Sequence, residues 1–64
     1  MLRNRLKEIR MKEYMMGSKE FAEMLGVNYT TYSKIENNKK SVSLENAYII
    51  AKKLNRNIED IWSE

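Results

Sequence analysis

The chain has 64 residues with a formal net charge of +3 at pH 7, and 42% of them are hydrophobic. A chain this short buries only about 60% of its unfolded surface, so we expect one domain, residues 1–64, built around one core. Because the sequence contains no cysteine and no histidine, thiol chemistry, disulfides and the usual zinc sites are excluded. We therefore expect no cofactor and no metal. Because the serine, lysine, tyrosine and glutamate side chains are scattered over helix surfaces with no evident acid–base pair, we also expect no enzymatic activity.

No segment of the chain resembles a signal peptide or a membrane span. The N-terminal stretch MLRNRLKEIR lacks an unbroken apolar core, and no run approaches the ~20 apolar residues that cross a bilayer. We expect a cytoplasmic protein without membrane contact. Basic residues gather in residues 1–12 and acidic residues in residues 59–64, so one end of the domain is suited to face phosphates.

Apolar residues near the N-terminus follow the spacing of an amphipathic helix. Leu2, Leu6 and Ile9 lie at positions i, i+4 and i+7, and this pattern predicts a first helix that runs to about Tyr14. The stretch MMGSKEF then interrupts the pattern, and Gly17 stands where a helix N-cap is expected. The methionines of this region are interpreted as adaptable packing residues and not as a ligand site.

A glycine-containing turn separates the second and third predicted helices. The second helix follows Gly17, and three of its residues are expected to face the core: Phe21, Ala22 and Leu25. Gly26 is predicted to end this helix in the left-handed conformation, and Asn28 is predicted to cap the third helix. Two helices joined in this way have the sequence form of a helix-turn-helix.

Two further helices are predicted in the last third of the chain. Ser43 is expected to cap the fourth helix. Its core-facing residues are expected to be Leu44, Ala47, Ala51 and Leu54. Asn57 is expected to cap a short fifth helix that carries Ile58, Ile61 and Trp62. Because no segment alternates as a strand does, the expected fold class is all-α.

The third helix, within GVNYTTYSKIENNKK, carries two unlike faces. At about 100° per residue, Tyr32 and Ile35 share the face that is expected to be core. Hydrogen-bonding side chains occupy the opposite face, flanked by aromatic and basic residues: Thr30, Ser33, Lys34 and Asn37, with Tyr29, Lys39 and Lys40. This face is suited to a polar, negatively charged partner. The alternative is a plain three-helix bundle whose polar face is only solvated.

Five pieces of the chain carry a resemblance to a known family: NRLKEIR, KEFAEMLGV, TYSKIENNKK, SLENAYIIAKKLN and NIEDIW. In this order they resemble the XRE, or lambda repressor and Cro-like, family of helix-turn-helix DNA-binding domains. The resemblance implies a compact five-helix, lambda-repressor-like domain in which helices two and three form the helix-turn-helix. It also implies that the third helix is a recognition helix, which reads base edges in the DNA major groove.

The resemblance implies roles for individual residues. Those that match the base-facing positions are Tyr29, Thr30, Ser33 and Lys34, although the Tyr29 hydroxyl could instead bind a phosphate. Those expected to contact the DNA backbone are Ser18, Lys19, Asn28, Asn37, Lys39 and Lys40. The family generally has glutamine in place of Ser18 and often glycine in place of Asn38. Arg10 and Glu36 match a pair that links the first and third helices, and Arg10 could also reach a phosphate.

Two places in the sequence suggest a protein partner, which we expect to be a second copy of the chain. Ile49 lies about 180° from the core side of its helix and is expected to be exposed. Ile61 and Trp62 lie near the C-terminus, where little chain remains to cover them. The expected dimer interface therefore contains Ile49, Ile61 and Trp62.

The function expected from these features is that of a sequence-specific, double-stranded DNA-binding transcriptional regulator. It would act as a repressor, as a homodimer on a two-fold symmetric operator, and without a small-molecule ligand. The alternative is a protein-interaction module, antitoxin-like or an anti-repressor partner, that retains the helix-turn-helix shape. Ser18 and the weakly basic total charge favour the alternative, whereas Lys39 and Lys40 favour DNA.

Overall fold

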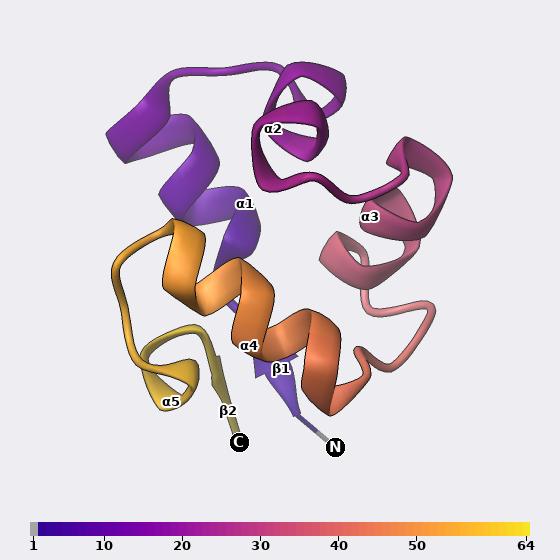
Figure 1. Ribbon diagram of the computed structural model, residues 1–64, viewed down its shortest axis with the longest axis vertical. Coiled ribbons are helices and arrows are strands. Elements are labelled where there is room, and N and C mark those ends of the chain that lie inside the picture. Colours follow the sequence, from indigo (N-terminus) through magenta and orange to yellow (C-terminus); the bar gives the residue numbers. More distant parts are fainter. Residues whose placement is uncertain (1) are drawn as a thin grey trace.

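A computed structural model describes residues 2–64 of the chain (Figure 1). Its elements in chain order are β1 (Arg3–Asn4), α1 (Leu6–Ile9), the π-helical segment η1 (Arg10–Tyr14), α2 (Ser18–Leu25), α3 (Tyr29–Glu36), α4 (Leu44–Lys53), α5 (Ile58–Ile61) and β2 (Trp62–Ser63). The predicted all-α fold with five α-helices is thus confirmed for the described residues, with a small strand pair in addition.

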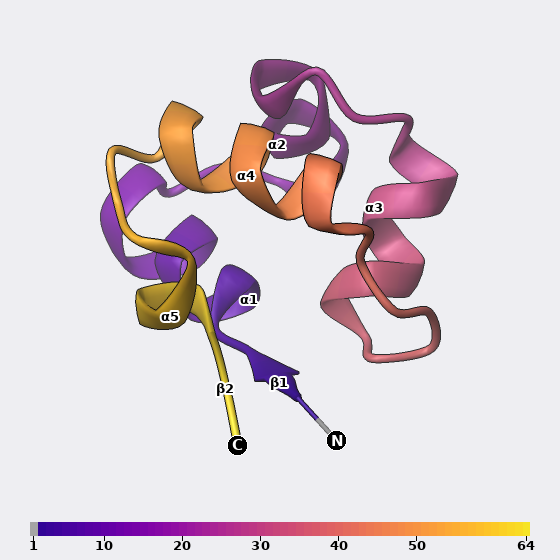
Figure 2. The same ribbon diagram turned by 60° about the horizontal axis from the view of Figure 1, so that its bottom comes forward.

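The strand pair joins the two ends of the described chain. β1 and β2 are antiparallel, with Arg3 opposite Ser63 and Asn4 opposite Trp62, and Figure 2 shows them side by side below the helices. The expectation that the chain has no strand is therefore wrong. Strands of two residues are too short to produce the alternating pattern by which a strand is recognised in a sequence.

The first helix begins later than its apolar spacing predicts. The side-chain oxygen of Asn4 accepts a hydrogen bond from the backbone N–H of Leu6 at 3.1 Å, and α1 starts at Leu6. Leu2 lies outside the helix and is exposed, so its assignment to the apolar face of the first helix is wrong. Leu6 and Ile9 do face the core.

The core lies between all five helices. Its buried residues are Leu6, Ile9, Phe21, Ala22, Leu25, Tyr32, Ile35, Ala47, Ile50, Ala51, Leu54, Ile61 and Trp62. Two edge-to-face aromatic contacts run through it, from Tyr14 to Phe21 at 5.3 Å and from Phe21 to Tyr32 at 5.7 Å between ring centroids. Such pairs add to the stabilisation that burial gives, and they tie α2 and α3 to the end of η1.

Helix α4 faces the core as predicted, except at its first residue. Ala47, Ala51 and Leu54 are buried as expected, but Leu44 is 79% exposed and Ile50 takes its place in the core. Leu44 is the first residue of the helix, directly after the cap in which the Ser43 hydroxyl accepts from Asn46 N–H. Val42, just before that cap, packs against the core instead, as a hydrophobic staple does.

Ile61 and Trp62 are core residues, so the expectation that they are exposed is wrong. Ile61 is 0% and Trp62 is 6% exposed. The start of the chain covers them, because β1 pairs with β2 and the backbone N–H of Arg5 donates to the carbonyl of Ile61 at 2.9 Å. This contact joins residues far apart in the sequence, which local patterns do not predict.

Candidate nucleic-acid interface

The turn between α2 and α3 is built from residues that end one helix and start the next. Gly26 has a φ of +75° and closes α2, and the N–H of Val27 donates to the carbonyl of Ala22 at 3.0 Å. The Asn28 side chain then accepts from the backbone N–H of Thr30 at 2.9 Å and caps α3. Both predicted caps are confirmed, and together they hold α3 across the end of α2 (Figure 1).

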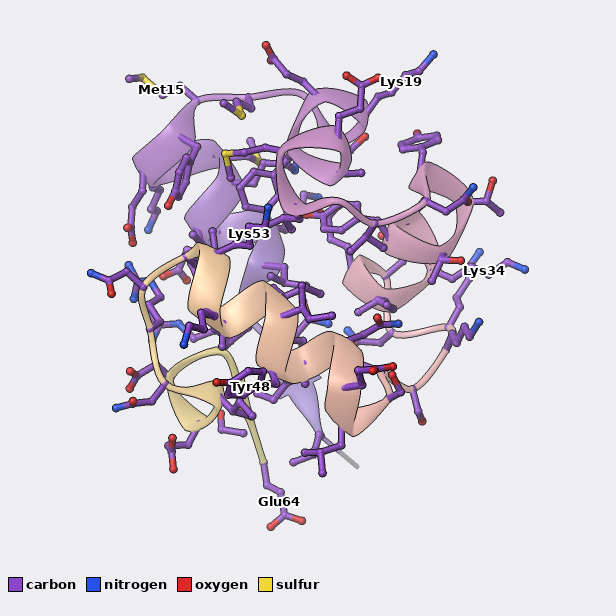
Figure 3. The ribbon with its side chains drawn as sticks, viewed as in Figure 1. Met15, Lys19, Lys34, Tyr48, Lys53 and Glu64 are labelled. Atoms are coloured by element: carbon purple, nitrogen blue, oxygen red, sulfur yellow. The ribbon has the colours of Figure 1, made fainter. Side chains whose placement is uncertain are left out.

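Helix α3 divides into a buried face and an exposed face. Tyr32 and Ile35 are buried in the core. The predicted base-reading residues lie on the outer side, where Tyr29, Thr30 and Lys34 are exposed and Ser33 is half-buried. Figure 3 shows Lys34 on α3 and Lys19 on α2 pointing outward on the same side of the molecule. The two helices thus present hydrogen-bonding and basic groups to solvent.

The starts of α2 and α3 meet through two hydroxyl groups. The Ser18 hydroxyl donates to the Tyr29 hydroxyl oxygen at 3.5 Å, a length at which such a bond is weak. Ser18 is the first residue of α2 and Tyr29 the first of α3. The Tyr29 hydroxyl is therefore directed towards the end of α2 at which free backbone N–H groups gather.

The remaining residues that were predicted to contact the DNA backbone fall into two groups. Lys19, Lys39 and Lys40 are exposed. Asn28 and Asn37 are also exposed, but their side chains bond their own helix. The Asn28 oxygen caps α3, and Asn37 Nδ2 donates to the carbonyl of Ser33 at 2.9 Å. The lysines supply charge, whereas these two asparagines shape the helix ends.

Arg10 and Glu36 form a largely buried ion pair between η1 and the end of α3. Arg10 Nε lies 3.0 Å from Glu36 Oε1, and the two side chains are 12% and 6% exposed. Arg10 Nη1 also donates to the carbonyl of Met16 at 2.8 Å, just before α2. The hydrogen bond to Glu36 raises the pKa of Arg10. Because these donors face inward, the geometry favours the structural role of Arg10 over contact with a phosphate.

The hydroxyl of Tyr32 completes this network through a contact that was not predicted from the sequence. It donates to Glu36 Oε1 at 2.6 Å, so one carboxylate oxygen accepts from both Tyr32 and Arg10. Burial, followed by the hydrogen bond to Glu36, raises the pKa of Tyr32. The spacing of Tyr32 and Glu36, four residues apart on one helix, is the signal that could have revealed the contact.

Other kinds of site find no support in the part of the chain that the structure describes. Residues 2–64 contain no group of three or more acidic, histidine or cysteine side chains that could hold a metal ion. None of the helices formed by these residues has the length and apolar character needed to cross a bilayer. The surface formed by α2, α3 and the loop after α3 is the candidate functional site.

Comparisons with known proteins agree with this geometry. A family described as helix-turn-helix matches residues 6–61. A protein of Archaeoglobus fulgidus, described as an uncharacterized HTH-type transcriptional regulator, is 41% identical over 61 residues, which span 95% of this chain and 84% of the relative. The control protein C.MunI of Mycoplasma sp is 33% identical over 61 residues, which span 95% of this chain and 82% of that protein.

Proposed function

The chain belongs to the helix-turn-helix family of DNA-binding transcription regulators, as its resemblance to the XRE family predicts, and we propose that it binds specific double-stranded operators as a homodimeric repressor. One observation carries the proposal. The outer face of α3 offers polar, hydrogen-bonding side chains, while the ion pair of Arg10 and Glu36 attaches the C-terminal end of α3 to η1. A rigid helix with an outward polar face suits the major groove.

In this proposal the outer face of α3 reads base edges. Lys34 donates to guanine O6 and N7, Thr30 and Ser33 donate or accept, and the Thr30 methyl group contacts a thymine methyl. Tyr29 stands at the margin of this face, with its hydroxyl against Ser18. From there its ring can contact bases while its hydroxyl contacts a phosphate, so both roles considered for Tyr29 are retained.

Contacts to the DNA backbone position α3 in the groove. Lys19 at the start of α2 and Lys39 and Lys40 after α3 are exposed and would bind phosphates. Ser18, the first residue of α2, is shorter than the glutamine usual in the family. The free N–H groups of the first turn of α2 therefore carry more of that phosphate contact.

We assign the dimer interface to the exposed side of α4. A single small module makes few base contacts, so two copies on half-sites about 34 Å apart are needed for tight specific binding. Ile49 is exposed on α4, as are Leu44 and Tyr48. Ile61 and Trp62, which were predicted to belong to the interface, are excluded from it because they are buried within the domain. A dimer that occupies an operator represses by excluding other proteins from that DNA.

Selection from a random pool of double-stranded DNA tests the function. We expect the purified chain to enrich a two-fold symmetric motif. A matched control is Lys12→Ala, which removes one exposed positive charge on η1, outside the surface formed by α2, α3 and the loop after α3. This variant should enrich the same motif. Failure of the wild type to enrich any motif would contradict the proposal and favour the protein-interaction module.

A further inference from the structure

The side chain of Asn4 connects the start of the chain to the end of the recognition helix. Its Nδ2 donates to the carbonyl of Ile35 at 2.7 Å and to the side-chain oxygen of Asn38 at 3.2 Å. Its Oδ1 accepts from the backbone N–H of Leu6 at 3.1 Å. A carbonyl must meet the amide nitrogen and an N–H must meet the amide oxygen, so these partners fix the orientation of the Asn4 amide.

The groups that Asn4 binds form the turn that follows α3. Asn38 has a φ of +60°, and its N–H donates to the carbonyl of Ile35 at 3.1 Å. The N–H of Lys39 donates back to the carbonyl of Lys34 at 2.8 Å. These two bonds form a Schellman motif, with an asparagine at the left-handed position. Asn4 thus bonds both a helix-end carbonyl and the side chain of the residue that reverses the chain.

Asn4 belongs to a strand that is anchored on the core. It lies opposite Trp62 in the β1–β2 pair, and the next residue, Arg5, bonds the carbonyl of Ile61 through its N–H. Asn4 lines the same surface groove as Lys39 and Lys40. The amide therefore joins an anchored strand to the segment that carries both lysines.

We propose that Asn4 is a positioning residue for DNA binding, which orders the loop of Lys39 and Lys40 so that both ammonium groups meet the sugar–phosphate backbone. The proposal rests on the proposed DNA-binding function. Ordering flexible side chains and loops on binding reduces affinity, and a loop ordered in advance avoids that loss. Asn4 touches no DNA in this account and acts through the turn at Asn38.

Two variants separate the bonds that Asn4 makes. Asn4→Ser keeps a short oxygen that can cap α1 but cannot span the distance to Ile35 and Asn38. Asn4→Asp keeps the capping oxygen at its full reach and removes both donors. Binding to operator and random DNA is measured at several salt concentrations, at a temperature where circular dichroism shows each variant to be folded.

We expect the salt dependence of Asn4→Ser to weaken by about one phosphate contact, and that of Asn4→Asp to weaken at least as much, because its carboxylate also adds a negative charge. A rise from ~50 to ~200 mM salt would then cost Asn4→Ser threefold to fourfold less affinity than it costs the wild type, equally on operator and random DNA. In a background that carries Lys39→Ala and Lys40→Ala, Asn4→Ser should cause no further loss. If Asn4 only stabilised the fold, the salt dependence would stay unchanged, and Asn4→Ser would reduce the DNA affinity in both backgrounds.

The outcomes distinguish this inference from the function on which it rests. Absence of DNA binding by the wild type contradicts the proposed function. Wild-type binding combined with an unchanged salt dependence in Asn4→Ser and Asn4→Asp overturns the role of Asn4 alone. Unfolding of both variants also overturns it, because the amide would then be needed for the fold and not for the placement of the loop.

Discussion

Three residues other than glycine adopt the left-handed conformation, at Met15, Asn38 and Asn55 in the described chain. Asparagine tolerates this region, whereas methionine is strained there by roughly 1–2 kcal/mol. Met15 has a φ of +51° and is 84% exposed, so it gains little from packing. Met15 therefore adopts a backbone conformation that its side chain disfavours.

Replacing Met15 by glycine is expected to stabilise the fold. The strain is removed, and the greater freedom of glycine in the unfolded chain offsets about 0.4–1 kcal/mol of the gain. The expected net increase in unfolding free energy is ~0.5–1 kcal/mol, measured by chemical denaturation. Met15→Ala is the control, since it loses the side chain but keeps the strained Cβ. An equal gain in both variants would show that strain is not the cause.

Tyr32 is expected to make stability depend on alkaline pH. Burial and the bond to Glu36 raise its pKa above the ordinary value of 10.0, so the folded state favours the neutral phenol. This contribution is fully present below pH ~10 and is lost as the pH rises from there through the folded-state pKa. Denaturation from pH 8 to pH 11 should therefore show the advantage of the wild type over Tyr32→Phe shrinking. A constant difference would contradict this assignment.

At the scale of elements, the ion pair of Arg10 and Glu36 holds η1, α3 and the segment before α2 together. We expect Arg10→Ala and Glu36→Ala each to lower the unfolding free energy by several kcal/mol, because each leaves a buried charge without its partner. The double variant should lose less than the sum of the two. Chemical denaturation of the four proteins of the cycle measures this coupling, and strict additivity would show that the pair does not act as a unit.

The helix ends were predictable from the sequence because capping is local. Gly26, Asn28 and Ser43 cap the predicted helices through bonds that span only a few residues. The spacing of Tyr32 and Ile35 likewise identified the inner face of α3, and with it the side that is left exposed. The exposure of Leu44 was not predictable, since it is apolar and fits the helical spacing of the core face, and only the cap at Ser43 and the packing of Val42 leave it outside the core.

Contacts between distant parts of the chain could not be predicted from local patterns. The pairing of β1 with β2 buries Ile61 and Trp62, although the end of a chain usually has little to cover it. Asn4 bonds residues 31 and 34 positions further along the chain, and no motif marks it. The faces of the site could therefore be predicted from the sequence, and the Arg10–Glu36 pair from the family resemblance, while the contacts of Asn4 could not.

At the scale of the whole molecule, the exposed apolar side of α4 is expected to join two copies. Ile49→Glu and Ile49→Lys should both weaken dimerisation and operator binding together, because either charge opposes the burial of an apolar surface. Ile49 is 39% exposed in the single chain, so the fold itself should change little. Sedimentation at micromolar concentration measures the association. A strict monomer that binds one half-site tightly would contradict the dimer.

The base-reading role of α3 is tested most directly by repeating the selection from random DNA with Lys34→Ala. We predict a motif that stays two-fold symmetric but loses its preference at one base position in each half-site, at a cost of ~1–3 kcal/mol on the original operator. Thr30→Ala should relax a different position. Lys39→Ala should leave the motif unchanged and weaken binding to all DNA. An unaltered motif with Lys34→Ala and Thr30→Ala would contradict base reading by α3.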